Sequence, residues 1–177
     1  MRWPSVRWIA VVLAFAMAAG VRAQSAAEYK LKAAFLYSFT RYVQWPASAF
    51  GGAGAPLVIG VLGRDPFDGE LERSLDGKTS DGHPLVSRHP ATADGVAGCH
   101  VVFVSADETG QLPALLAKLG TSPVLVIGEA EGFCGRGGTI ELFLEDARIR
   151  FRINQANAAR AGLTISSHLL RLAVLVK

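Results

Sequence analysis

Apolar positions in the middle of the chain form continuous runs bounded by turn residues. Three such runs lie within PLVIGVLG, CHVVFVS and SPVLVIG, at residues 56–63, 99–105 and 122–128. Continuous runs of this length predict strands that are buried on both faces of a parallel sheet. A weaker strand is predicted at 83–89, and short helical patterns cover 66–75 and 111–120. This order predicts a single layered domain, an open and mostly parallel α/β sheet with flanking helices and right-handed crossovers.

The pattern changes near the C-terminus, where GTIELFLEDARIRFRIN alternates between apolar and polar residues. Alternation of period two on both sides of a short turn predicts an antiparallel hairpin. A loop at Asp146-Ala147 places Glu141 opposite Arg152. A loop one residue earlier places Glu141 opposite Arg150 instead. In either register one apolar face packs inward, and the arginines meet carboxylates across the strands.

Three arginines of this hairpin, Arg148, Arg150 and Arg152, recur at a spacing of two. One interpretation is that they form the solvated face of a half-covered pair of strands. The other is that they form a binding strip for an acidic molecule, in which case Arg150 is a candidate partner contact.

The segment AAEYKLKAAFLYSFTRYVQWP predicts a helix over residues 26–43. Trp45-Pro46 ends it, because proline disfavours helical backbone at the residue before it. The apolar stripe of this helix is unusually wide. Burial on two sides explains the width, and an exposed aromatic patch that contacts a partner is the alternative. The candidate partner contacts on and just after this helix are Phe35, Phe39, Tyr42 and Trp45.

A short helix over QANAARA is followed by TISSHLLRLAVLV, which predicts a final helix capped by Thr164 or Ser166. The expected core stripe of the final helix is Ile165, Leu169, Leu172 and Val176. His168 and Arg171 share another side of it, with Leu175 a turn further on. This side is either an ordinary solvent-facing strip or a small contact patch, so His168 and Arg171 are also candidate partner contacts.

The chain begins with a basic and then apolar segment that is typical of an export signal. Two arginines precede an apolar run from Trp8 to Val21, and Val21 and Ala23 place small residues at the −3 and −1 positions of a cleavage site. A membrane-spanning helix needs about 20 apolar residues, which is more than this run contains. We therefore expect residues 1–23 to be a signal peptide cleaved after Ala23. Residues 24–177 are then one periplasmic domain without a membrane span.

Cleavage would change the charge of the protein. The full chain has 18 Lys and Arg against 15 Asp and Glu. Three of the arginines lie in the leader, so the mature chain would carry 15 basic and 15 acidic side chains and be neutral. This removes the main electrostatic support for nucleic-acid binding, and no nucleic-acid partner is expected. The segment 136–177 is nevertheless basic, with 7 basic and 3 acidic residues.

No constellation typical of catalysis, cofactor binding or metal binding is present in the sequence. The glycines of VIGVLGRDPFDGE and GFCGRGGT match neither a dinucleotide fingerprint nor a P-loop. No nucleophile elbow of the GxSxG type occurs. The histidines lack zinc-type spacing; they are His83, His89, His100 and His168. We therefore expect no enzyme activity, no cofactor and no metal.

Cys99 and Cys134 are the only cysteines. Cys99 precedes one predicted parallel strand and Cys134 follows the next one, so the two should lie at opposite edges of the sheet. A disulfide needs Cα atoms within roughly 7 Å, so these positions disfavour an intrachain bond, although export would permit one. Cys134, in an expected open loop, is then a free or intermolecular thiol.

Several of these segments resemble the YfiR family of exported bacterial proteins. They are AFLYSFTRYVQWP, GCHVVFVS and, most specifically, GGTIELFLEDARIRFRINQANAARAGLTISSHLLRLA. The resemblance covers nearly all of residues 26–177 and implies a periplasmic α/β domain that can form homodimers. Family members often carry more cysteines, including stabilising and redox-responsive disulfides. This chain departs from that pattern, because residues 24–98 contain no cysteine that could pair with Cys99.

The resemblance implies a regulator rather than an enzyme. The implied role is to bind and inhibit the periplasmic sensing domain of an inner-membrane diguanylate cyclase, which lowers cyclic-di-GMP and with it biofilm and exopolysaccharide output. An OmpA-like outer-membrane lipoprotein that sequesters the regulator is the implied second partner. Such an inhibitor must bind the inactive conformation of the cyclase better than the active one.

The residues themselves leave a second function open, that of a periplasmic small-molecule-binding sensor or carrier. Open α/β sheets bind ligands beyond the C-terminal ends of their strands, here near 63–65, 105–107 and 128–131. Acidic residues outnumber Arg64 at those ends, which disfavours anionic ligands. A periplasmic hydrolase is the third and weakest hypothesis, because no reactive motif supports it.

Overall fold

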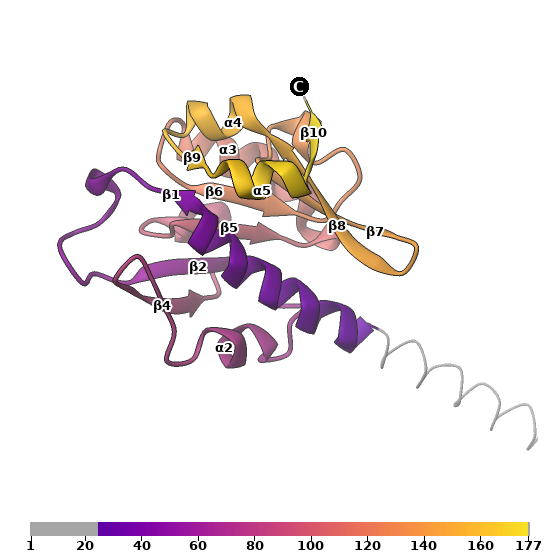
Figure 1. Cartoon of the computed structure of the whole chain (residues 1–177), viewed down its shortest axis with the longest axis horizontal. Helices are drawn as coiled ribbons and strands as arrows, with labels where there is room; N and C mark the ends of the chain where they lie inside the picture. Colours follow the sequence, from indigo (N-terminus) through magenta and orange to yellow (C-terminus); the bar gives the residue numbers. More distant parts are fainter. Residues whose placement is uncertain (1–24, 177) are drawn as a thin grey trace, which may run out of the picture.

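The protein folds as an eight-stranded, mostly parallel sheet with helices on both faces (Figure 1). The computed structural model describes residues 25–176; the leader expected over residues 1–23, with its cleavage after Ala23, lies outside the described residues. The strand order is β10-β8-β7-β6-β5-β2-β4-β3. The β7–β8 and β3–β4 pairs are antiparallel, and the other pairs are parallel. The predicted fold class is confirmed.

The elements have the following bounds. The main sheet contains β2 (Leu57–Leu62), β3 (Thr79–Ser80), β4 (His83–Arg88), β5 (Val101–Val104), β6 (Leu125–Gly128), β7 (Ile140–Glu145), β8 (Arg148–Asn154) and β10 (Val174–Val176). A separate two-stranded sheet pairs β1 (Val43–Gln44) with β9 (Thr164–Ile165). The first helix covers residues 25–42, followed by α2 (Glu70–Leu75), α3 (Leu112–Leu119), α4 (Gln155–Arg160) and α5 (Ser167–Leu172). Short 3-10 turns are η1 (Ala47–Ala49), η2 (Ala93–Val96), η3 (Ala106–Gln111) and η4 (Cys134–Arg136).

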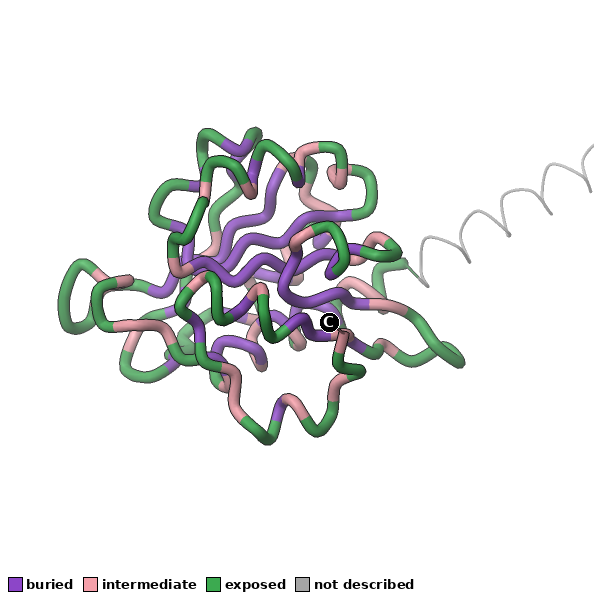
Figure 2. Tube along the Cα trace, turned by 90° about the horizontal axis from the view of Figure 1, so that it is seen from above, coloured by how far each residue is buried: buried purple, intermediate pink, exposed green. Residues whose placement is uncertain are grey.

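Residues of the central strands alternate between two hydrophobic cores. Ile59 and Val61 of β2 face the core that the first helix, α2 and α5 cover. Val58 and Leu62 of the same strand face the core that α3 covers. Successive side chains of a strand point to opposite faces of the sheet, so a strand with cover on both sides is apolar throughout. Figure 2 shows these buried strands enclosed by more exposed helices and loops.

The hairpin has the register expected for a loop at Asp146-Ala147. Glu141 lies opposite Arg152, and the register with the earlier loop is wrong. Both loop residues have positive φ, 49° for Asp146 and 59° for Ala147. A two-residue turn of this type matches the twist of the strands it joins, but it needs a left-handed backbone at both positions. Asparagine, aspartate and glycine tolerate that backbone better than alanine.

Replacement of Ala147 by glycine should therefore stabilise the fold, by about 0.5–1 kcal/mol, because glycine adopts positive φ without the steric cost that a Cβ brings. Urea denaturation measures the change. Ala156→Gly is the matched control, because this exposed alanine lies inside helix α4; there glycine should destabilise the fold by a similar amount. Equal losses of stability in both variants would contradict the turn geometry.

The final predicted helix is too long. Helix α5 ends at Leu172, and residues Val174–Val176 form strand β10, which pairs with β8. Ser166 caps the helix as expected, since its hydroxyl accepts a hydrogen bond from the backbone N–H of Leu169 at 3.2 Å. Leu169 is buried, but Leu172 is 63 % exposed, so the predicted core stripe is wrong beyond the first turn. A short apolar run at the open edge of a sheet gains hydrogen bonds by joining it, which the helical spacing does not reveal.

Both cysteines are free and buried. The expectation of an open loop around Cys134 is wrong. Cys134 lies in η4 with its thiol against the carbonyl oxygen of Thr139, at 3.5 Å. It is therefore not placed to form an intermolecular bond in this conformation.

Candidate functional site

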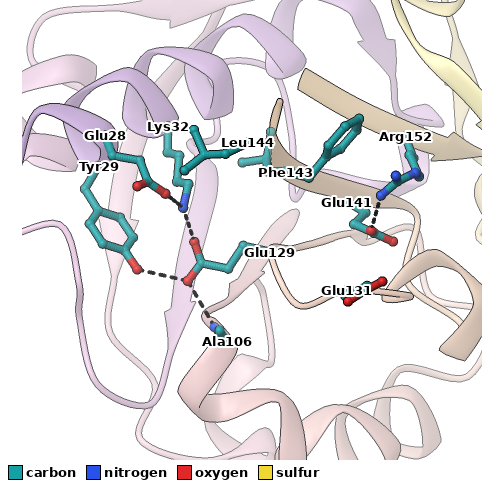
Figure 3. A pocket seen from close by; sticks show the side chains of 11 residues that line it. Glu28, Tyr29, Lys32, Ala106, Glu129, Glu131, Glu141, Phe143, Leu144 and Arg152 are labelled. Carbon is teal, nitrogen blue, oxygen red and sulfur yellow. Dashed lines mark hydrogen bonds and ion pairs between the residues drawn. The ribbon is translucent and has the colours of Figure 1, made fainter. Parts of the chain in front are cut away.

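A polar pocket lies where the C-terminal ends of the central strands meet the N-terminal part of the first helix (Figure 3). Its volume is about 490 Å³, and its walls combine charged side chains with Phe143 and Leu144 of β7. The C-terminal ends of neighbouring parallel strands meet at one edge of a sheet, so residues that follow β5 and β6 reach the same place. Tyr29 and Lys32 extend into the pocket from the first helix.

Glu129, the first residue after β6, is the centre of this pocket, and its side chain is 6 % exposed. One carboxylate oxygen accepts hydrogen bonds from the Tyr29 hydroxyl and the Ala106 backbone N–H, both at 3.0 Å. The other accepts from Lys32 Nζ at 2.5 Å, and the same ammonium pairs with Glu28. Burial of a charge requires such partners. Burial, followed by the Glu129 charge, raises the pKa of Tyr29 well above its usual value, so its hydroxyl remains a donor.

Glu141 is a second buried carboxylate on the β7 wall of the pocket, and its side chain is 2 % exposed. Arg152, opposite it on β8, donates from Nη1 at 2.6 Å, and the Cys134 backbone N–H donates to the other oxygen at 3.3 Å. Burial, followed by the Glu141 charge, raises the pKa of the Cys134 thiol to about 12. The thiol is therefore protonated at neutral pH and is a poor nucleophile.

The three hairpin arginines have different environments. Arg152 neutralises a buried carboxylate, whereas Arg150 pairs with Glu145 at 3.1 Å, where both side chains are about half exposed. Arg148 is exposed. The solvated-face interpretation thus describes Arg148 and Arg150, and Arg152 has a structural role that the alternation alone does not distinguish. Arg150 remains accessible to a partner.

A second pocket, of about 590 Å³, adjoins the first and shares Tyr29, Ala106 and Glu129 with it. Its other charged lining residues are Arg64, Asp65, Asp68 and Asp107. The strand ends that the sequence predicts as a ligand position therefore do line pockets. Acidic side chains outnumber basic ones in both pockets, so this edge of the sheet can hold a cationic or polar molecule better than an anion.

The structure brings together two surfaces that the sequence predicts separately. Strand β1 follows the first helix and pairs with β9, which precedes α5, so the C-terminal end of the first helix lies beside α5 (Figure 1). The rings of Tyr42 and His168 stack with centroids 5.3 Å apart. Arg171 is exposed, and Leu172 and Leu175 are 63 % and 53 % exposed. The terminal-helix face is defined by Tyr42, His168, Arg171 and Leu172; Leu175, expected a helical turn further on, lies instead on strand β10.

The remaining candidate contacts of the first helix lie mostly in the core. Phe39 is fully buried and packs edge-to-face against Phe151, with ring centroids 5.2 Å apart; Phe35 is half-buried and contacts the same ring at 5.9 Å. Burial, rather than an exposed patch, thus explains Phe39, which is not on the surface. Trp45 is partly buried, and its indole N–H donates to the carbonyl oxygen of His100 at 3.2 Å.

The structure also contains a cluster of ionisable side chains that no sequence pattern predicts. Potential ligand atoms of Asp65, Glu72 and His89 lie within 4.8 Å of one another, although the residues come from three separate segments. His89 Nε2 lies 2.9 Å from a Glu72 oxygen, and Nδ1 lies 3.9 Å from Asp65. The two ring nitrogens thus face different carboxylates, and the cluster is best described as an imidazole held between two acids.

The sequence matches the model of a known protein family over most of its length. Residues 29–174 match the model of the YfiR/HmsC-like family, a range that includes the main residues of both pockets, the hairpin and the terminal-helix face. The chain belongs to the YfiR/HmsC-like family. The resemblance seen in the three quoted segments is therefore confirmed. Membership of the YfiR/HmsC-like family supports a regulatory rather than an enzymatic role, in cyclic-di-GMP signalling.

Two solved structures are similar to this YfiR/HmsC-like chain. The ABC domain from Streptococcus pneumoniae, in complex with L-Trp, has 14% sequence identity and a TM-score of 0.49 over 68% of this chain and 55% of that chain. A conserved domain protein from Vibrio cholerae has 18% identity and a TM-score of 0.46 over 68% of this chain and 54% of that chain. The chain thus spans about half the length of each. No curated protein matches the sequence significantly.

Within residues 25–176, none of the helices combines the length and the apolar character that crossing a membrane requires.

Proposed function

We propose that this YfiR/HmsC-like protein is exported to the periplasm, where it binds and inhibits the periplasmic sensing domain of an inner-membrane diguanylate cyclase. Lower cyclic-di-GMP would then reduce biofilm and exopolysaccharide output. The observation that carries the proposal is the terminal-helix face. It groups an imidazole, a guanidinium and the exposed side chain of Leu172 on a member of a regulatory family. Exposed apolar side chains gathered beside polar ones are typical of protein-binding surfaces.

The charges around the terminal-helix face support an acidic partner surface. From Ala147 to Val176 the chain has five arginines and one histidine and no Asp or Glu. Arg150 and Arg152 are neutralised by carboxylates of β7, whereas no ion pair of Arg171 is found within residues 25–176. A segment of the sensing domain that presents carboxylates beside apolar side chains would complement Arg171 and Leu172 together.

Inhibition by binding requires a difference in affinity. The protein must bind the inactive conformation of the sensing domain more tightly than the active one, and a shift of the equilibrium from 1:99 to 99:1 needs about a 10⁴-fold difference. An OmpA-like outer-membrane lipoprotein, the second proposed partner, would relieve inhibition by binding the free regulator and lowering its available concentration.

The double variant Arg171→Glu, Leu172→Ser tests the proposed surface. Both side chains are exposed, so the fold should be kept while the affinity for the sensing domain falls at least about tenfold, as is usual when a central contact of an interface is lost. Binding is measured by calorimetry with the purified sensing domain, and cyclic-di-GMP in cells should rise toward the level of a deletion strain. Lys30→Glu, an exposed change elsewhere on the first helix, is the matched control.

The two measurements test the binding surface and the inhibitory function separately. Unchanged affinity of the double variant would show that another surface binds the sensing domain. Unchanged cyclic-di-GMP in the deletion strain would overturn the inhibitory function itself.

The pockets favour a second candidate function, that of a periplasmic small-molecule-binding sensor or carrier. The support is their place at the strand ends of an open α/β sheet and the buried carboxylates of Glu129 and Glu141. Thermal denaturation with a panel of amines, neutral metabolites and carboxylic acids tests it, because a ligand that binds only the folded state raises the midpoint by mass action. Cationic members should raise the midpoint most, and a panel without any effect would overturn this candidate.

A further inference from the structure

Strand β8 has an open edge near the tip of the hairpin. Strand β7 pairs with it from Arg148 to Ile153, whereas β10 pairs only with residues 152–154. Residues 148–151 therefore have no strand partner on the β10 side within the part of the chain that the structure describes, and the hairpin extends beyond the rest of the sheet (Figure 1). An open edge of this kind presents unpaired backbone N–H and C=O groups, which can pair with a further strand.

The backbone groups at this edge can be assigned from the register of the hairpin. Glu145 and Arg148 close the two-residue turn as a hydrogen-bonded pair, and pairs with and without hydrogen bonds then alternate along the strands. Leu144 and Ile149 are therefore a pair without hydrogen bonds, and Ile149 directs its N–H and C=O away from β7. Among residues 25–176, no backbone hydrogen bond joins Ile149 to another element. One donor and one acceptor are thus available to a partner.

The side chains beside the open edge differ between the two faces of β8. Arg148 and Arg150 lie on one face, and Ile149 and Phe151 lie on the other, because successive residues of a strand point to opposite sides. Arg148 is exposed and has no ion pair within the described residues, and the pair of Arg150 with Glu145 is half exposed. Ile149 is half-buried, and Phe151 packs against aromatic rings of the first helix. An added strand would meet cations on one face and apolar groups on the other.

The open edge is continuous with the terminal-helix face. Val174, the first residue of β10, lies beside Arg152, and only Ala173 separates Val174 from Leu172 at the end of α5. The end of α5 therefore borders the uncovered part of β8. A partner that contacts Arg171 and Leu172 can continue along β8 without crossing another element.

The charges at the edge distinguish between two occupants. A second copy of the chain, paired edge to edge, would bring Arg148 and Arg150 beside the same two arginines, and like charges opposite each other destabilise a strand pair. From Ala147 to Val176 the chain contains no Asp or Glu, so this segment of a second copy offers no compensating carboxylate. A segment with acidic residues at alternate positions would instead pair with both arginines.

We propose that the edge of β8 from Arg148 to Phe151 binds an extended segment of a partner protein as an additional strand, and that this segment alternates acidic and apolar residues. The acidic residues pair with Arg148 and Arg150, the apolar residues extend the face of Ile149, and the backbones exchange hydrogen bonds. Four residues of a strand span about 13 Å, so a short segment is sufficient. The binding mode does not rest on the proposed cyclase partner, and its test does not use the sensing domain.

A hexapeptide of alternating glutamate and valine is the probe, and its lysine–valine counterpart is the charge control. The glutamate peptide should bind the purified exported chain at least about tenfold more tightly than the lysine peptide, and it should protect the amide hydrogen of Ile149 from exchange with solvent. Equal affinity for the two peptides, or binding without this protection, would overturn the proposal. Protection that appears without peptide and grows with protein concentration would also overturn it, because a second copy would then occupy the edge.

Two backbone-methylated forms of the glutamate peptide test the strand geometry. One form carries N-methyl groups on its valines and the other on its glutamates, so each form loses the amide hydrogens along one edge of the peptide. Only one edge of an added strand faces β8. One form should therefore bind as the parent peptide does, and the other should lose affinity at least about tenfold. Equal affinities of the two forms would be incompatible with strand addition.

The double variant Arg148→Gln, Arg150→Gln tests the charge pairing. Both side chains are exposed, so the fold should be kept, and the affinity for the glutamate peptide should fall about tenfold because two exposed ion pairs are lost. Arg160→Gln, which changes an exposed arginine of α4, is the matched control and should bind as the wild type does. If the double variant binds the peptide as tightly as Arg160→Gln, the proposal is wrong.

Discussion

Replacement of Lys32 by methionine is expected to destabilise the fold by about 3–5 kcal/mol, because it leaves the buried carboxylate of Glu129 without a cation. The Lys32 side chain is 6 % exposed and methionine fills most of its volume, so the loss is electrostatic rather than a cavity effect. Tyr29 and the Ala106 N–H would still donate to the carboxylate, but neutral donors do not replace the ammonium. Urea denaturation at pH 7 measures the change.

Two further variants control for this interpretation. Lys30→Met removes an exposed lysine of the same helix and should change the stability by less than about 0.5 kcal/mol. The double variant Lys32→Met, Glu129→Gln removes both charges and should recover much of the loss, since the amide can still accept from Tyr29. If Lys32→Met is no less stable than Lys30→Met, the described pairing of Lys32 with Glu129 is wrong.

Replacement of Phe39 by alanine is expected to cost about 3–5 kcal/mol, the usual range for truncation of a buried phenylalanine. Phe39 is fully buried and packs against Phe35 and Phe151, so its removal leaves a cavity between the first helix and the hairpin. Leu31→Ala is the matched control on the same helix, because Leu31 is 55 % exposed. Thermal and urea denaturation measure both. A stable Phe39→Ala variant that no longer binds a partner would instead revive the surface interpretation of Phe39.

The hairpin shows what sequence reasoning predicts well. Its register follows from period-two alternation and from a turn of two residues, and both signals are local, so the pairing of Glu141 with Arg152 was one of two expected registers. The central strands are equally clear because burial on both faces leaves uninterrupted apolar runs. The same reasoning fails for Val174–Val176, whose strand state depends on β8, about 20 residues away in sequence.

The candidate site was predictable only in part, for a related reason. The strand ends near Gly128–Glu131 indicate one edge of the sheet, and Glu129 does lie there. The sequence does not show that Tyr29 and Lys32, about 100 residues earlier, reach that edge, where Lys32 neutralises Glu129 and Tyr29 donates a hydrogen bond to it. The terminal-helix face was also predictable only in part. The sequence patterns suggested partner contacts on the first and the last helix separately. They did not show that the two segments are adjacent, as the stacking of Tyr42 on His168 makes them.

The placement of the first helix against the C-terminal third has a consequence for biosynthesis. Phe35 and Phe39 pack against Phe151, and Val43 pairs with Ile165, so the first helix has part of its packing partners among the last residues to be synthesised. Phe35 and Phe39 cannot make these contacts until the hairpin has been synthesised, and long-range contacts of this kind form late. The fold of the first helix is therefore completed only after the hairpin and β9 have been synthesised.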